Sequence, residues 1–383
     1  MNNLEATKLL TKIISPVDKD TQKIASQIKK FNDSNWEQLI EVANRNTLIP
    51  VLYKSLIRKD LIKLIQDEQL LGYLEAFYKM NEERNIGIVK QLQEITTIFE
   101  EIGIKPILLK GAAALSESHY ESIGERVMID VDIAVDYERV MEAVDALKQS
   151  GYKETDPTSH LEVKWHHYRR LYRDDIPAAV EIHRTFLNAR ANHYLPKEDK
   201  THFLQSSYFK NALVFSPSYD LYYSFLHTQM SHRYHTYEHL SIRHLEHFCL
   251  IATKYNVDLN AITKIAKEKD LVDIWQAYLL VQKEFFNLEV DKTIVTNQSA
   301  KNYLQQVETK LLKNNSSWLK VKAFSKKTLL ALGYTNLRKY YQFENKLLLV
   351  YYIPLRVVTL IYSYSISSKK RGKLYDDIDN LSS

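Results

Sequence analysis

Apolar residues recur every three or four positions over roughly the first 95 residues of the chain, as in helices that bury one face. Trp36, Leu39 and Ile40 are examples of this spacing. The last helix of this region is predicted to end at Gly103, because glycine readily adopts the left-handed conformation that follows a helix. The helical spacing returns from about Ser216. Helical regions are therefore expected at both ends of the chain.

The pattern between these two regions is typical of strands. Residues 106–109 form a short apolar run, and apolar side chains alternate with other residues along 127–135. A hairpin is predicted next, with strands over 163–173 and 178–186, because a turn sequence separates two extended stretches. Short strands mixed with short helices indicate a compact unit of mixed secondary structure in the middle of the chain.

The predicted fold class is therefore α+β, with three regions. A small mixed β-sheet core at 104–215 is flanked by an N-terminal helical region at 1–103 and a C-terminal helical region at 216–383. The polar residues that are capable of chemistry are concentrated in the core. We expect the functional site there, and we expect the helical regions to supply specificity.

The composition is that of an ordinary globular protein and excludes several classes. Hydrophobic residues make up 45% of the chain and charged residues 26%, which is a normal balance for folded domains. The net charge of +5 is too small to indicate nucleic-acid binding by itself. A single cysteine, Cys249, excludes a disulfide framework and a zinc site of several thiolates. The first residues do not resemble a secretory signal, so a cytoplasmic location is expected.

One apolar stretch near the C-terminus raises the question of membrane contact. Residues 347–366 are nearly long enough to cross a bilayer, and basic residues flank them. Pro354 and Arg356 at the centre of the stretch argue against a simple span, because a charge in the membrane is costly and proline interrupts a helix. Three interpretations stay open: a buried helix, an element at 346–373 that contacts the inner face of a membrane peripherally, and a transmembrane helix.

Two aspartates lie within the otherwise apolar strand of the core. Asp130 and Asp132 are two positions apart, so their side chains point to the same face, while Val131 points the other way. Two neighbouring carboxylates repel each other and need a cation or water. Rigidly held oxygen ligands suit Mg²⁺ (or Mn²⁺), which can bind substrate phosphates at the same time. Such a pair alone is a weak signal, but its setting in this core strengthens it.

A third acid lies on the returning strand of the predicted hairpin. Glu181 and His183 share one face of that strand. If the strand lies beside that of Asp130 and Asp132, three carboxylates converge, and Glu181 either binds the metal or takes the proton from an attacking hydroxyl. In the alternative, Glu181 is a solvated strand residue and His183 a structural neighbour.

A strand followed directly by a helix start precedes the acidic strand. Lys110, Gly111 and Ala112 form this junction, where free backbone N–H groups favour anions and glycine permits the close approach of a phosphate. Lys110 adds a point charge, and Arg126 can make a forked contact to phosphate oxygens. Both cations could instead be structural ion-pair partners of the acids.

The order of these motifs resembles the nucleotidyltransferases of the DNA polymerase β-like superfamily, and more narrowly a bacterial family of uncharacterised nucleotidyltransferases. The resemblance is carried by residues 107–115, 126–135 and 180–183. It implies that Asp130, Asp132 and Glu181 bind divalent metal and that the helix start at Gly111 holds nucleotide phosphates. One departure is that Ala112 offers no hydroxyl, where the superfamily usually has Gly-Ser or Gly-Gly.

The activity that the resemblance implies is the metal-dependent transfer of a nucleotidyl group, or of a phosphoryl group, from a nucleoside triphosphate such as ATP. The acceptor is an unidentified hydroxyl or phosphate on a small molecule, glycan or peptide, and a nucleic-acid acceptor is not favoured. Two alternatives are a non-catalytic protein that binds a nucleotide or partner on the same fold, and a toxin-like enzyme that modifies RNA or protein.

Two further groups of polar residues have no settled role in the sequence. On the outgoing strand of the hairpin, one of two faces could meet the substrate, with His167, Arg169 and Arg173 on one and His166 and Arg170 on the other. Six histidines lie between 227 and 247, where they either bind a metal through His235 and His239, line the substrate cleft, or pack between helices: His227, His232, His235, His239, His244 and His247.

Overall fold

The computed structural model describes residues 1–18, 20–154, 166–197 and 199–313, and every structural statement below concerns these residues. Contacts divide the chain into one unit at Met1–Leu312 and a second at Lys313–Ser383. The first unit contains the sheet and the candidate site. The expected membrane-surface element at 346–373 lies outside the described residues. Among the helices that the structure describes, none combines the length and the apolar character that a membrane span needs.

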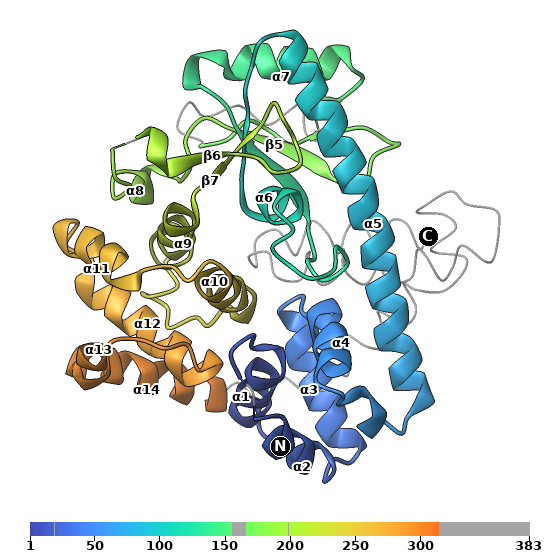
Figure 1. The fold of residues 1–383 in the computed structure, drawn as a ribbon, viewed down its shortest axis with the longest axis vertical. Coiled ribbons are helices and arrows are strands. Elements are labelled where there is room, and N and C mark those ends of the chain that lie inside the picture. Colours follow the sequence, from blue (N-terminus) through green and yellow to red (C-terminus); the bar gives the residue numbers. More distant parts are fainter. Residues whose placement is uncertain (19, 155–165, 198, 314–383) are drawn as a thin grey trace, which may run out of the picture. The chain divides into compact units, whose positions relative to one another are not determined.

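A seven-stranded mixed sheet lies in the upper part of the first unit as drawn in Figure 1. Its strands are β1 (Ile107–Leu108), β2 (Asp130–Ala134), β3 (Lys153–Glu154), β4 (Leu171–Tyr172), β5 (Ala179–His183), β6 (Phe203–Gln205) and β7 (Leu213–Phe215). The spatial order is β3-β4-β5-β2-β1-β7-β6. The β2–β5 and β1–β7 pairs are parallel and the others antiparallel. With helices on either side in sequence, this architecture confirms the α+β prediction.

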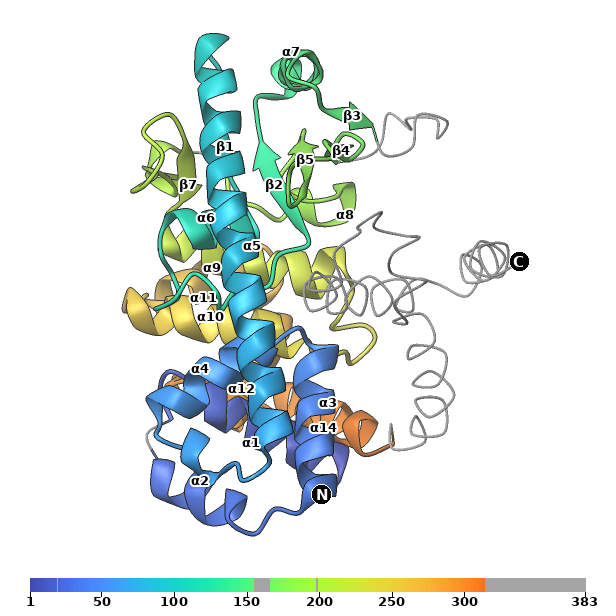
Figure 2. The same ribbon diagram turned by 90° about the vertical axis from the view of Figure 1, so that its right-hand side faces the viewer.

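One long helix and one short helix cover the apolar face of the sheet. Helix α5 (Glu68–Glu101) runs along the sheet in Figure 2, and α7 (Val140–Gln149) packs beside it. Ile133 and Ile182 from the two central strands are fully buried in the core that these helices share. Burial of each such side chain contributes roughly 1.5–3 kcal/mol to stability. The strands are therefore anchored by one face, which leaves the other face for polar residues.

The predicted end of the long helix is confirmed. Helix α5 begins after Asp67, whose carboxylate accepts hydrogen bonds from the backbone N–H groups of Gln69 and Leu70. It ends at Glu101, and Gly103 has φ of +67°, the left-handed conformation that glycine adopts without a steric cost.

Two predicted strands are shorter in the structure than the sequence pattern suggested. Strand β2 begins only at Asp130, because the carbonyl groups of Met128 and Ile129 accept hydrogen bonds from the guanidinium of Arg84 instead of from a neighbouring strand. In the hairpin, the outgoing strand is reduced to β4 and an isolated bridge between His167 and His183, and its first residues, 163–165, lie outside the described residues.

The remaining helices lie in the two helical regions and, for two short ones, in the core. The N-terminal region contains α1 (Asn3–Ile14), α2 (Thr21–Ile28), α3 (Asp33–Arg45) and α4 (Ile49–Arg58). The core contains the short helices α6 (Lys110–Ser116) and α8 (Ala189–Asn192). The C-terminal region contains α9 (Pro217–Leu226), α10 (Ile242–Lys254), α11 (Leu259–Glu268), α12 (Val272–Phe286), α13 (Lys292–Thr296) and α14 (Gln298–Lys313). The chain from Ser216 to residue 313 is thus mostly helical, with a non-helical stretch at 232–241, and the rest of the chain lies outside the described residues.

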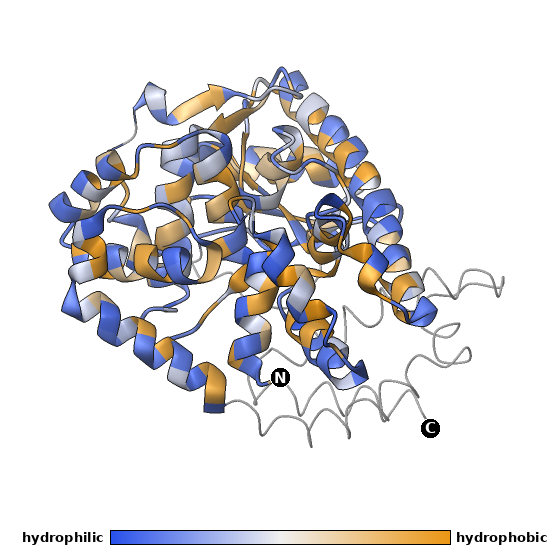
Figure 3. Ribbon diagram, turned by 60° about the horizontal axis from the view of Figure 1, so that its bottom comes forward, coloured by the Kyte–Doolittle hydropathy of each residue, from blue (hydrophilic) through white to orange (hydrophobic). Residues whose placement is uncertain are grey.

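The two helical regions are joined to each other by packing. The hydroxyl of Ser15, at the end of α1, donates a 2.7 Å hydrogen bond to the carbonyl of Phe286 at the end of α12. Figure 3 shows polar and apolar residues alternating along the peripheral helices, as expected where one face of each is buried. Phe225, Phe248 and Trp275 form an aromatic centre among α9, α10 and α12. This packing fixes α9 and α10, which border the candidate site.

Candidate functional site

The polar face of the two central parallel strands carries the acids. Asp132 pairs with Glu181 in the register of β2 and β5, and Asp130 lies two residues earlier on the same face. Val131 and Val180, which alternate with the acids, are fully buried on the opposite face. The alternation that buries the apolar side chains therefore also places the carboxylates together.

Asp132, Glu181 and His183 form the tightest group of possible metal ligands in this region. One potential ligand atom from each lies within 4.8 Å of the others. His183 Nε2 donates a 2.8 Å hydrogen bond to Asp132 Oδ1 and lies 3.8 Å from Glu181 Oε2. All three residues are buried. Asp130 is not a member of this group, and its side chain is 21% exposed, so the site has an opening at this end.

Two cations partly neutralise the three carboxylates. Lys110 Nζ donates a 2.6 Å hydrogen bond to Asp132 Oδ1. Arg170 bridges the other two acids, with Nε 2.6 Å from Glu181 Oε1 and Nη2 2.9 Å from Asp130 Oδ2. Arg170 therefore meets two of the acids, and His167, from the other predicted hairpin face, also lies near them, with Nε2 3.9 Å from Glu181 Oε2. With His183 neutral, three acids against two cations leave one net negative charge, which favours the binding of a further cation.

The two aspartates differ in their affinity for a proton. Burial and the nearby charges of Asp132 and Glu181 raise the pKa of Asp130 to about 6, against the opposing effect of Arg170. Burial alone would also raise the pKa of Asp132, but Lys110 and His183 outweigh burial and hold this pKa well below its usual range. Burial lowers the pKa of His183, so its imidazole is neutral near pH 7. Asp132 thus stays ionised where Asp130 can still take up a proton.

The C-terminal helical region faces these acids with an aromatic and imidazole surface. Tyr223 on α9 is buried, and its hydroxyl has no hydrogen-bond partner among the described residues. Burial raises the pKa of this hydroxyl, and the charges of Lys110 and Asp132 act on it. His227, one helical turn later, stacks on Tyr223 with ring centroids 5.9 Å apart. The sequence did not identify Tyr223, although its i, i+4 spacing from His227 was a usable signal.

The six histidines of 227–247 divide into separate environments. His227 and His232 lie close enough to Lys110 for its charge to lower their pKa values, after the larger effect of burial. His235 stacks on Tyr303, with ring centroids 4.5 Å apart, and His239 lies against Tyr234. Within the described ranges, no group of three possible metal ligands includes His235 or His239. The structure therefore supports the interpretation in which part of the cluster borders the site.

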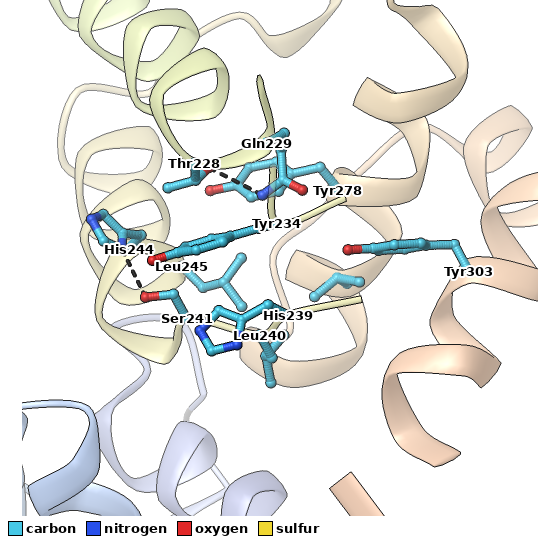
Figure 4. Close-up of a pocket in the computed structure, with 11 residues that line it drawn as sticks. Thr228, Gln229, Tyr234, His239, Leu240, Ser241, His244, Leu245, Tyr278 and Tyr303 are labelled. Carbon is cyan, nitrogen blue, oxygen red and sulfur yellow. Dashed lines mark hydrogen bonds between the residues drawn. The ribbon is translucent and has the colours of Figure 1, made fainter. Parts of the chain in front are cut away.

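A small pocket lies next to these histidines (Figure 4). It is lined by Thr228, Gln229, Tyr234, His239, Leu240, Ser241, His244, Leu245, Tyr278, Val281 and Tyr303. The π-helical turn His227–Ser231 precedes it, and π-helical turns occur frequently at functional sites. Its volume of about 20 Å³ holds one water molecule, so it is too small for a substrate group.

The residues expected to contact phosphate lie in different surroundings. Gly111 and Ala112 are buried in the first turn of α6, and a Cβ on Gly111 would come within 2.9 Å of Met128 Cγ. A larger residue at position 111 would therefore require the Met128 side chain to move. Lys110 has φ of +50°, an uncommon conformation for a lysine, and its ammonium is paired with Asp132. The side chain of Arg126 is buried and has no ion pair among the described residues.

A second buried group of possible metal ligands lies away from the acids. His119, Asp220 and His247 come within 4.8 Å of one another, with His247 Nε2 3.5 Å from Asp220 Oδ2. Arg126 and Arg243 are near enough for their positive charges to lower the pKa of His247. Two neighbouring guanidinium groups disfavour a metal cation there, so we assign this group to packing between α9 and α10.

The comparisons with known proteins agree with this geometry. A family model described as an uncharacterised nucleotidyltransferase matches residues 32–287, which is well over half of the chain and includes every residue of the acid cluster. No curated protein and no solved structure matches the chain.

Proposed function

We propose, because this chain belongs to the family of uncharacterised nucleotidyltransferases, that it transfers a nucleotidyl group from a nucleoside triphosphate to an acceptor. The acceptor oxygen forms a bond to the α-phosphorus, the bond from that phosphorus to the bridging oxygen of the β-phosphate breaks, and pyrophosphate leaves. The acceptor is a hydroxyl or phosphate on a small molecule, glycan or peptide. If the triphosphate instead binds with its γ-phosphorus at this position, the acceptor oxygen attacks the γ-phosphorus, a phosphoryl group is transferred and the nucleoside diphosphate leaves.

The observation that carries the proposal is the register of the two parallel strands. Asp132 and Glu181 are direct neighbours, Asp130 lies on the same face, and Arg170 contacts both Asp130 and Glu181. Carboxylates in such a cluster repel each other, so the arrangement is costly without cations. A protein that only needed a stable sheet could replace these acids by uncharged residues at lower cost.

The donor atoms suit a divalent cation with a preference for oxygen. Asp130, Asp132 and Glu181 would hold Mg²⁺ or Mn²⁺, the ions that carboxylate ligands favour. When bound, such an ion neutralises charge on the transferring phosphate and helps to align the attacking oxygen with the leaving group. His183 orients Asp132 through its 2.8 Å hydrogen bond, as partners of metal-binding carboxylates commonly do. A direct contact of His183 with the nucleotide stays a prediction.

The other residues have roles in charge and positioning. Glu181 either completes the set of metal ligands or accepts the proton of the attacking hydroxyl. Lys110 and Arg126 bind phosphate oxygens, and the backbone of Gly111 and Ala112 borders the same phosphates. Lys110 already pairs with Asp132, so one ammonium group links the acid cluster to the phosphates.

The test is the release of pyrophosphate by the full chain with each common nucleoside triphosphate and Mg²⁺, in the presence of pooled metabolite, glycan and peptide acceptors. We expect Asp130→Asn to lower the rate at least about a hundredfold, as for other removed electrostatic contacts in active sites. Asp136→Asn, an exposed change just after the same strand, is the matched control. Wild-type turnover by Asp130→Asn would exclude the proposed metal site. Label from the α-phosphate then identifies the class of acceptor.

A further inference from the structure

The side chain of Arg126 is buried, and most of its N–H donors have no acceptor among the described residues. It is 7% exposed, and neither Nε nor Nη1 has a hydrogen-bond partner among the described residues. Its backbone is held firmly, because the carbonyl of Arg126 accepts hydrogen bonds from the amide groups of Asn81 and Asn85. A buried guanidinium with unused donors is costly unless a ligand supplies acceptors.

A second arginine lies beside it. Arg243 is in the first turn of α10, where its Nη1 donates a 3.4 Å hydrogen bond to the hydroxyl of Thr47. No ion pair of Arg243 occurs among the described residues. Burial and then the positive charge of Arg126 lower its pKa to about 10, and the charge of Asp130 also acts on it. Arg243 lies one helical turn before Glu246 on α10, and the hydrogen bond between Tyr120 and Glu246 places the loop of Arg126 against this part of the helix. Arg126 itself precedes Asp130, at the open end of the acid cluster, by four residues.

The acids near these arginines form no ion pair with them among the described residues. Glu246, on the same helix as Arg243, accepts a 2.8 Å hydrogen bond from the hydroxyl of Tyr120, and burial raises its pKa to about 7. Glu125, the residue before Arg126, is paired with Arg58 at 2.8 Å. The same Tyr120–Glu246 contact holds the loop that carries Arg126 against α10. The structure thus brings two arginines from distant parts of the chain together and leaves them short of negative charge.

We propose that Arg126 and Arg243 together bind the polyphosphate tail of the nucleoside triphosphate. The inference rests on the proposed function and assigns to the tail a place distinct from the acid cluster. Planar guanidinium forks bind phosphate oxygens two at a time, so two of them can contact two successive phosphate groups. The neighbouring acid cluster then lies at the α-phosphate, so the pair fits the β- and γ-phosphates.

This pair also makes a prediction about the protein without ligand. Like charges in a partly desolvated place repel each other, and the repulsion is offset only when the anion is bound. Removal of either charge should leave the melting temperature of the free protein unchanged or raise it, while binding of the anion is lost. Replacement of a residue that contributes only to stability would instead lower the melting temperature and leave binding of the anion unchanged.

The test uses the full chain and inorganic tripolyphosphate without metal, with binding measured by calorimetry and melting temperature. Arg126→Gln and Arg243→Gln should each weaken binding at least about tenfold, which is about 1.4 kcal/mol. Arg243→Lys should lie between them and the wild type, because it keeps the charge and loses the fork. Arg190→Gln, an exposed arginine on α8, is the control and should bind as the wild type does.

The outcomes separate this inference from the proposed function. Wild-type affinity for tripolyphosphate in either glutamine variant overturns the arginine pair, whatever the enzyme does. If a glutamine variant does not fold, the lysine variants Arg126→Lys and Arg243→Lys replace it. Wild-type affinity for tripolyphosphate in both folded lysine variants would also overturn the arginine pair. Asp130→Asn should retain tripolyphosphate binding while it loses turnover. If Asp130→Asn keeps its turnover and the arginine variants lose binding, the proposed metal site fails and the arginine pair stands.

Discussion

The bridge made by Arg170 leads to a quantitative expectation about metal binding. Its guanidinium is hydrogen-bonded to carboxylate oxygens of Asp130 and Glu181 at 2.9 and 2.6 Å. These are two of the residues that would hold the divalent ion, so Arg170 and the metal compete for the same carboxylates. Arg170→Gln removes the competing charge and leaves a side chain that can still donate hydrogen bonds. We therefore expect this variant to bind Mn²⁺ more tightly than the wild type.

The size of the effect follows from the contact distances and from the exposure of the arginine. Two unit charges about 4 Å apart interact by about 4 kcal/mol at an effective dielectric constant of about 20. The side chain of Arg170 is 34% exposed, so solvent screening reduces this to about 1–2 kcal/mol. The affinity for Mn²⁺ should accordingly rise by about 5- to 30-fold.

Electron paramagnetic resonance of free Mn²⁺, titrated with protein in the absence of nucleotide, measures this affinity directly. Arg169→Gln is the matched control, because Arg169 is the neighbouring residue and forms its ion pair with Glu154. The control should bind Mn²⁺ as the wild type does. Unchanged or weaker binding in Arg170→Gln would show that Arg170 does not occupy the metal position.

Three further predictions concern pH and packing. The pKa of Asp130 is raised to about 6, so Mn²⁺ binding by the wild type should strengthen as the pH rises from 5 to 7. Mn²⁺ binding by Asp130→Asn should not depend on pH in this range. An equally steep pH dependence in the variant would contradict the assignment of Asp130 as a metal ligand. Lys110→Met leaves the buried carboxylate of Asp132 without its ammonium partner and should lower the free energy of unfolding by about 3–5 kcal/mol in urea titrations. A decrease below about 1 kcal/mol would show that the ion pair of Lys110 with Asp132 contributes little to stability. Gly124→Ala places a Cβ 2.7 Å from an aromatic ring on α5 and should lower the free energy of unfolding by about 1–3 kcal/mol. Gly72→Ala adds a Cβ that meets nothing within 4 Å and should raise the free energy of unfolding by up to about 1 kcal/mol. Equal melting temperatures for the two variants would contradict this packing.

The sequence alone predicted those features that depend on local alternation. The strand of Asp130 and Asp132 could be recognised because apolar and acidic residues alternate, and that alternation fixes which side chains share a face. The parallel pairing of Asp132 with Glu181 could only be hypothesised, because it joins residues far apart in the chain. The resemblance to a nucleotidyltransferase family made this hypothesis reasonable, and the register of the sheet brings the two residues together.

The remaining features depend on tertiary contacts that no local pattern contains. Arg169 and Arg170 are adjacent, and only the arrangement of the hairpin against β5 determines that Arg170 meets the acids. Arg126 and Arg243 come from different regions, so their proximity follows from the packing of α10 against the loop before β2. The late start of the predicted strand, at Asp130, likewise results from the contact of Arg84 on α5 with the carbonyl of Met128.

The most direct measurement of the central claim is anomalous diffraction from crystals of the full chain grown with Mn²⁺ and a nucleoside triphosphate that resists cleavage. We expect a manganese peak bounded by the carboxylates of Asp130, Asp132 and Glu181, with the guanidinium of Arg170 moved off the acids. Manganese bound elsewhere, or no manganese at these carboxylates when nucleotide is bound, would contradict the claim that the two central strands form a metal-dependent nucleotidyl transfer site.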